Sequence, residues 1–143
     1  MKFRKTAILS GLLFYMGLVH ISFADNAVND KRVSLGLPPH MKTHQLMNMR
    51  SHVEAVQTII GLLADGNFNE ASGVAHSRLG LTEEMKRMCN MFQNEDFRTL
   101  GFQFHKSADH LAEVLKTKDM KKSLDALHNT MGYCVSCHAT FRQ

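Results

Sequence analysis

The chain contains no proline after Pro38-Pro39, and beyond that pair its apolar residues recur at intervals of three and four. Residues at that spacing gather on one face of an α-helix, whereas a half-buried strand requires strict alternation. Paired prolines favour extended backbone before them and a helix start after them. The sequence therefore predicts an extended segment over 25–39 and an all-α domain over 40–143 that begins near His40.

Four amphipathic helical segments joined by short turns are predicted after His40. The first, over 40–65, ends before Gly66, which can adopt the left-handed conformation that closes a helix. The second covers 68–79, and we interpret the segment over 82–92 as its continuation after a break at Gly80, with a separate short helix as the alternative. A loop over 94–99 then leads to helices over 100–116 and 120–141, and Asp119 can cap the last helix. Such a pattern is typical of an antiparallel four-helix bundle.

The predicted core faces of the first and last helices follow from the same spacing. The residues expected to point inward are Leu46, Met49, Val53, Val56, Ile60 and Leu63 in the first helix, and Leu124, Leu127, Met131 and Tyr133 or Cys134 in the last.

The first 24 residues have the layout of a cleavable secretion signal. Three basic residues precede an apolar run over 7–19, and small residues follow it at Ser22 and Ala24. The run is shorter than the ~20 residues that span a bilayer, which favours cleavage over a membrane anchor. Removing 1–24 takes three of the 17 Lys and Arg but none of the 13 Asp and Glu, leaving 14 minus 13, or +1. We therefore expect a periplasmic protein and no nucleic-acid partner.

The motif Cys134-Val135-Ser136-Cys137-His138 indicates covalent haem attachment. Cysteines three apart share a helix face, so both sulfurs can reach the two vinyl groups of one porphyrin. His138, four residues after Cys134, lies on nearly the same face and can place a ring nitrogen on the iron. The sequence predicts one haem c per chain, covalently attached, with His138 as an iron ligand.

A thioredoxin-like redox pair and a zinc site are the alternative interpretations of this cysteine spacing. A redox pair is expected near a βαβ pattern, which the sequence lacks. A zinc site requires four ligands, and the remaining cysteine, Cys89, is solitary. We interpret Cys89 as a buried apolar thiol, with a surface thiol that links two copies of the chain as the alternative.

A haem motif at the end of a helical bundle, followed by Phe141-Arg142, resembles the class II c-type cytochromes, the cytochrome c prime family. The resemblance covers about 40–143. It implies that His138 is the proximal iron ligand and that Arg142 lies near it, where it can orient the ring or balance haem charge. The short second helix and the extra segment over 82–92 depart from the family pattern.

The opposite face of the iron has several candidates near the start of the first helix. Family members carry either an apolar residue or a methionine there, and we predict Met49 as the ligand, with Met47 next. A histidine ligand is a further alternative. The histidines in the first and third long helices are His40, His44, His52, His105 and His110, of which we expect His105 to contact the haem pocket.

Two functions are consistent with these features. The first is a one-electron carrier, not an enzyme, that exchanges electrons with redox partner proteins. The alternative is a five-coordinate haem that binds nitric oxide or carbon monoxide for gas buffering or sensing. The sequence contains no signature of an enzyme such as a peroxidase, and a homodimer is compatible with either function.

Overall fold

The computed structural model describes residues 30–143. The predicted secretion signal and the first residues of the predicted extended segment lie outside this range. The helices are α1 (Pro39–Ala64), α2 (Phe68–Val74), a five-residue π-helix η1 (Ala75–Leu79), α3 (Glu83–Asn90), α4 (Glu95–Leu115) and α5 (Met120–Thr140). The two short strands are β1 (Val33–Ser34) and β2 (Phe141–Arg142). None of the helices in the described part is long and apolar enough to cross a membrane.

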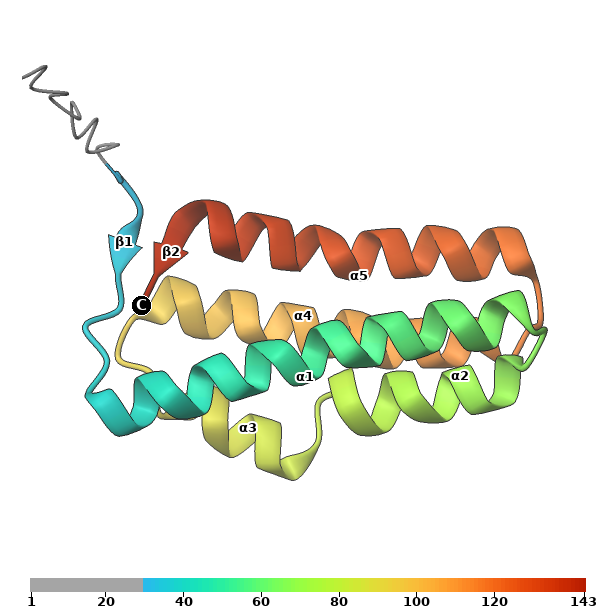
Figure 1. Cartoon of the computed structure of the whole chain (residues 1–143), viewed down its shortest axis with the longest axis horizontal. Coiled ribbons are helices and arrows are strands. Elements are labelled where there is room, and N and C mark those ends of the chain that lie inside the picture. Colours follow the sequence, from blue (N-terminus) through green and yellow to red (C-terminus); the bar gives the residue numbers. More distant parts are fainter. Residues whose placement is uncertain (1–29) are drawn as a thin grey trace, which may run out of the picture. The chain divides into compact units, whose positions relative to one another are not determined.

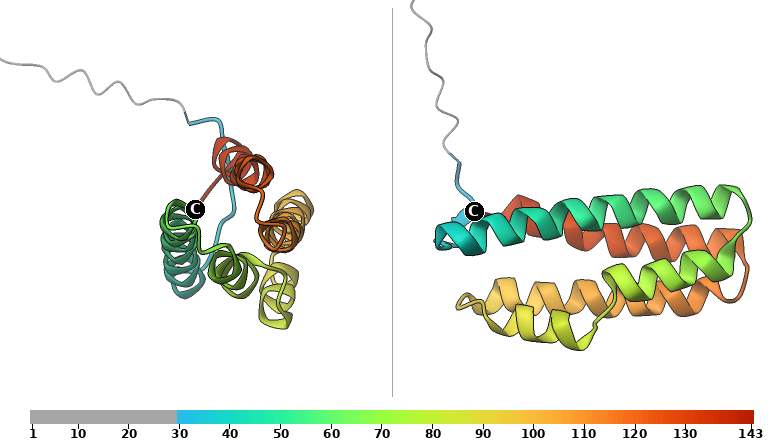
Figure 2. Two further views of the ribbon diagram at one scale, coloured as in Figure 1. Left: turned by 90° about the vertical axis from the view of Figure 1, so that its right-hand side faces the viewer. Right: turned by 60° about the horizontal axis from the view of Figure 1, so that its bottom comes forward.

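The helices form an antiparallel four-helix bundle, which confirms the predicted fold class. Figure 1 shows α1 and α4 running in one direction and α2 and α5 in the other, and Figure 2 shows the helices grouped around a common axis. The second arm of the bundle consists of α2, η1 and α3. Its α2 part packs against both α1 and α4, and α4 packs along α5.

The break in this second arm lies at Gly80. Its backbone is extended, and a Cβ added there would collide with the Asp109 carboxylate and the His76 carbonyl. The same carboxylate accepts hydrogen bonds from the Leu81 backbone N–H at 3.1 Å and pairs with His76 Nδ1 at 2.8 Å. The chain restarts at Thr82, whose hydroxyl accepts from the Met85 N–H. The segment after the break is therefore a separate helix.

The loop predicted over 94–99 is wrong, because α4 begins at Glu95. Asn94 caps this helix by accepting a hydrogen bond from the Phe97 backbone N–H at 2.8 Å. Glu95 and Asp96 follow at the positive end of the helix dipole. The polar run that suggested a loop is thus a helix N-terminus. By contrast, the predicted cap Asp119 is confirmed, since it accepts from the Lys122 N–H at 3.0 Å.

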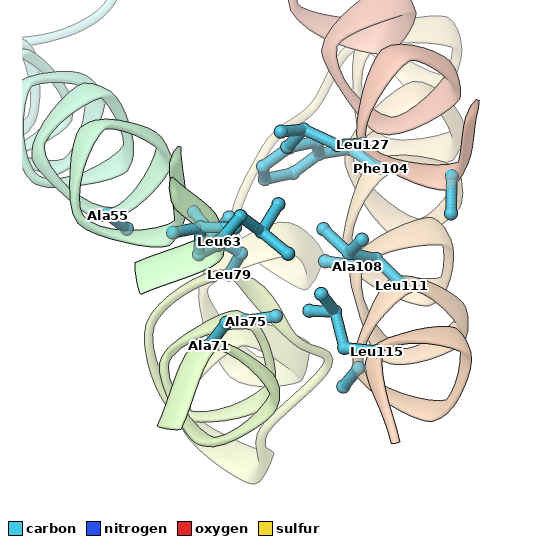
Figure 3. Packing of buried hydrophobic residues seen from close by; sticks show 13 residues of the cluster. Ala55, Leu63, Ala71, Ala75, Leu79, Phe104, Ala108, Leu111, Leu115 and Leu127 are labelled. Carbon is cyan, nitrogen blue, oxygen red and sulfur yellow. The ribbon is translucent and has the colours of Figure 1, made fainter. Parts of the chain in front are cut away.

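The main core fills the centre of the bundle and joins α1, α2, η1, α4 and α5. Its largest fully buried apolar side chains are Ile59, Leu79, Leu111 and Leu115, and small alanines let the helices approach closely. Figure 3 shows several of these side chains converging from the facing helices. The core ends before the last turns of α5, where a cavity and a second apolar cluster begin.

The predicted core stripe of α1 is mostly wrong. The buried residues of this helix are Gln45, His52, Ala55, Ile59 and Leu63, so Leu63 is the one predicted residue that is fully buried, and Val56 is half-buried against the main core. Val53 is 70% exposed and Ile60 is also exposed, because the inward face is rotated relative to the predicted one. In α5, Leu127 is buried as predicted, whereas Leu124 and Met131 are exposed.

The extended segment before α1 is tied to the C-terminus of the chain. Strand β1 pairs in parallel with β2, with Val33 opposite Phe141, and the Leu35 N–H donates to the Arg142 carbonyl at 2.9 Å. Leu35 and Leu37 pack on a second apolar cluster, which we call the end cluster. Its buried members are Phe92, Phe97 and Phe141. The segment from Val33 to Leu37 is therefore packed against the helices.

Candidate cofactor site

A cavity of about 640 Å³ opens between α1, α3, α4 and α5. Its walls are predominantly apolar, with polar side chains at a few points. Cavities that hold cofactors or small ligands have volumes of roughly 300–1,000 Å³ and the same mostly apolar lining. The cavity lies between the main core and the end cluster, since Phe104 of the first and Phe92 and Phe97 of the second line it.

The last turns of α5 bring Cys134, Cys137 and His138 to the wall of this cavity. Both cysteines are free and partly buried. Burial raises the pKa of Cys134, and burial together with the neighbouring Cys134 thiol raises the pKa of Cys137 to about 11. Redox-active Cys-X-X-Cys pairs instead have lowered thiol pKa values. The electrostatics of this pair therefore disfavour the thioredoxin-like alternative.

The opposite wall of the cavity is formed by α1. Leu46, Met49, Val53 and Val56 all line it, so most of the predicted core stripe faces the cavity rather than the packed core. Met47 does not line the cavity and is 63% exposed. The structure thus brings Met49 to the same cavity as the α5 motif and leaves Met47 outside.

His105 of α4 lines the cavity and is buried. Its Nδ1 lies 2.6 Å from the Leu79 carbonyl oxygen, which can only accept a hydrogen bond, so Nδ1 carries the proton. Burial is the main reason that the pKa of His105 is lowered. A ring nitrogen bonded to a backbone carbonyl fixes the tautomer and orientation of an imidazole.

His52 of α1 also lies at the cavity wall, although His105 is the histidine that the sequence favours there. His52 lines the cavity and is 8% exposed, and its buried Nε2 has no hydrogen-bond partner among residues 30–143. Burial, reinforced by the nearby His105 and Arg78, lowers the pKa of His52 to about 4. The sequence pattern that could have indicated His52 is a second helix face, formed by Gln45, His52, Ala55 and Ile59. This face is hard to recognise as buried because its first two residues are polar. The exposed His40, His44 and His110 lie outside the cavity wall.

Arg142 lies in β2 and does not line the cavity. Its backbone is held by β1, and its side chain is exposed. Arg32 contacts the motif, since its guanidinium donates to the His138 carbonyl at 3.3 Å. The role that the resemblance implies for Arg142 remains a prediction.

Cys89 is buried at the cavity wall, where its sulfur lies close to Gly101. A Cβ at Gly101 would lie 3.2 Å from Sγ, so the glycine makes room for the thiol. Burial raises the pKa of Cys89. Cys89 is therefore a buried thiol, as predicted, and it does not lie at the surface, where it could form a disulfide with a second chain.

The residues at this cavity fit a covalently held haem. Two thiols and an imidazole project from one helix, a thioether lies on the facing helix, and the lining between them is apolar. The wall also contains the buried His52 imidazole. His138 would hold the iron, and the cysteines would hold the porphyrin edge.

Comparison with known families gives an independent result. The family described as Cytochrome C' matches residues 42–142. No match to this chain was found among curated proteins or solved structures. The matched region contains all of α1 except its first three residues and all of α2 to α5, and with them every side chain described above at the cavity wall.

Proposed function

This chain belongs to the cytochrome c′ family, and from that premise we propose that it is a periplasmic one-electron carrier. Membership makes it a c-type haem protein that contains iron. Proteins of this family are haem-binding carriers or binders rather than typical enzymes. The observation that carries the proposal is the meeting of Met49 with Cys134, Cys137 and His138 at one apolar cavity.

We propose that one haem per chain is attached through thioether bonds from Cys134 and Cys137. The helical spacing places both sulfurs on one face of α5, and the cavity beside them has the volume and the lining for the group. His138 completes the attachment as the proximal ligand. The Arg32 bond to its carbonyl and the Phe141 packing beside Cys137 support the end of α5 from outside the cavity.

Met49 is our proposed ligand on the opposite side. The bound haem supplies an iron that can change its charge by one electron. A thioether favours the reduced state and raises the potential. The apolar walls from α1 and α4 exclude water and lower the local dielectric, which limits reorganisation when the charge changes.

The cellular setting follows from the sequence features. The secretion-signal layout of 1–24 supports a periplasmic location, where attachment of haem to Cys-X-X-Cys-His motifs takes place. We propose that the partners are redox proteins. A net charge of +1 for the mature chain gives no support to an anionic polymer as the partner.

The test is an optical spectrum of the exported protein in both oxidation states, together with its mass. We expect a mass increase of one haem and a low-spin spectrum with a sulfur-to-iron charge-transfer band, which Met49→Ala abolishes. Met47→Ala is the matched control, because that side chain is exposed and outside the cavity; it should leave the spectrum unchanged. A mass equal to the bare polypeptide would refute the attachment. A high-spin wild-type spectrum would refute the Met49 ligand and favour binding of nitric oxide or carbon monoxide.

A further inference from the structure

The small net charge of residues 25–143 hides an uneven distribution of charge along the chain. Residues 31–53, which comprise β1 and the first half of α1, contain no carboxylate, although Asp30 directly precedes them. Their cationic side chains are Lys31, Arg32, Lys42 and Arg50. Residues 126–143 add Arg142, again without a carboxylate side chain, whereas residues 54–75 contain three acidic side chains and no Lys or Arg. Positive charge is therefore concentrated in the segments that adjoin the haem motif.

The cations in these segments are not neutralised by nearby carboxylates. Lys31, Lys42 and Arg50 are exposed, and none of them forms an ion pair with another residue of the described chain. At the opposite end of the bundle the lysines are paired: Lys116 with Glu113, Lys121 with Asp125 and Lys122 with Asp119. The cations near the motif therefore produce an unbalanced positive potential in the solvent around them.

The cavity opens to solvent between α1 and α5. Its lining residues from α3 and α4 are buried or half-buried, whereas several from α1 and α5 are exposed. We call these exposed lining residues the cavity mouth: Leu46, Arg50, Val53, Glu54, Met131 and His138. Glu54 pairs with Arg78, which balances its charge. Arg50 thus places one of the unpaired cations at the cavity mouth itself.

The other cations lie at the end of the bundle where α5 terminates. Figure 1 shows β1, β2 and the start of α1 at that end, and the α4–α5 turn at the other. Lys31 and Arg32 directly precede β1, and Lys42 lies in the first turn of α1. Arg32 also contacts the motif through the His138 carbonyl. A molecule that approaches the cavity mouth from this end therefore meets positive charge.

Exposed apolar side chains accompany the cations. Leu46, Val53 and Met131 of the cavity mouth are exposed, and so is Val135, which lies between the two motif cysteines. Interfaces between proteins combine an apolar centre with a polar rim, and opposite charges on the two rims steer the encounter. The cavity mouth and its surroundings supply such a centre with a positive rim.

We propose that the cavity mouth and the cations around it form a docking surface for an electron-transfer protein whose own surface is acidic around its redox centre. The proposal rests on the haem site and the carrier function proposed above. One electron would pass between the haem iron and the partner's centre, so that one is oxidised as the other is reduced. An anionic membrane would also attract the cations, but its lipids have no centre that accepts the electron. A second copy of this chain would bring like charges face to face.

The test compares two double variants of the haem-loaded protein that have the same net charge. Lys31→Glu with Lys42→Glu reverses two cations of the docking surface, and neither side chain lines the cavity. Lys116→Glu with Lys118→Glu reverses two cations at the α4–α5 turn. The measurement is the second-order rate constant with which the reduced protein passes one electron to hexacyanoferrate(III), a small anion. Tris(phenanthroline)cobalt(III), a small cation, is the matched oxidant.

Reversal at the docking surface should slow the reaction with hexacyanoferrate by about fivefold or more at an ionic strength of about 0.1 M, and should speed the reaction with the cobalt complex. The control variant should change either rate by less than about twofold, since α4 is about 30 Å long and the Debye length is about 10 Å. At about 1 M salt the variants should react alike. Polyglutamate, an acidic polymer that accepts no electrons, should inhibit the wild-type reaction with hexacyanoferrate but not that of Lys31→Glu with Lys42→Glu.

Equal effects of the two double variants would mean that the rates report net charge alone, and would overturn the inference while the haem site stands. Wild-type binding to vesicles of anionic phospholipid that Lys31→Glu with Lys42→Glu abolishes would assign the surface to a membrane and overturn it too. So would a dimer in sedimentation that Leu46→Glu converts to a monomer. A colourless protein with the mass of the bare polypeptide would instead overturn the proposed function, and the inference with it.

Discussion

Replacing Phe141 by alanine should destabilise the haem-loaded protein by about 3 kcal/mol or more. Phe141 is 7% exposed, and its ring meets that of Phe97 nearly edge-on at a centroid distance of 5.3 Å. Truncation of a buried phenylalanine costs about 3–5 kcal/mol, which combines the lost transfer free energy with the cavity left behind. The neighbouring Phe92 and Leu35 can relax only partly into the space, since both are held by other contacts of the end cluster.

Urea unfolding followed by circular dichroism measures this loss. With a denaturant slope of about 1–3 kcal/mol per molar urea, the midpoint should fall by about 1–3 M. Val33→Ala is the matched control, because it shortens the residue opposite Phe141 in β1 but that side chain is 46% exposed. It should change the free energy of unfolding by less than about 0.5 kcal/mol. A loss below about 1 kcal/mol for Phe141→Ala would refute the packing of the end cluster.

Three further predictions concern single polar groups. Ser72→Ala should cost about 1 kcal/mol of unfolding free energy, because the buried hydroxyl donates to the Ala112 carbonyl at 2.8 Å and so links α2 to α4. Burial lowers the pKa of His52 to about 4 from about 6.5 in the unfolded chain, so the unfolded state binds the extra proton and stability is lost as pH falls between these values. Between pH 7 and pH 4 the free energy of unfolding should fall by up to about 3 kcal/mol more for wild type than for His52→Leu. An equal pH dependence of the two proteins would contradict this. Thiol titration of the denatured haem-loaded protein should find only Cys89 reactive, and three reactive thiols would contradict attachment at the motif.

The sequence was sufficient to predict the features that depend on neighbouring residues. The Cys-X-X-Cys-His spacing, the Asp119 cap and the Gly66 turn each involve a few consecutive positions with one evident physical role. The helical fold followed from the absence of proline and the repeated intervals of three and four.

The features that could not be predicted depend on distant partners. The apolar side chains of α1 fall into two groups, one facing the core and one facing the cavity, and hydrophobic spacing does not distinguish these environments. Apolar spacing therefore favours the helix face that contains Val53 as the core face, although the face that contains His52 is the buried one. The β1–β2 pairing joins two-residue strands from opposite ends of the chain, which leaves no periodic signal in either.

The pairing of β1 with β2 also has a consequence for the order of biosynthesis. Val33 is among the first residues of the described domain to be synthesised, whereas its partner Phe141 is among the last and lies three residues after His138 of the motif. Contacts between such distant positions close late, since the intervening chain must be ordered first. Until this strand pair forms, the end of α5 lacks its neighbouring strand, and the haem attachment proposed above would have an interval in which both thiols are less enclosed.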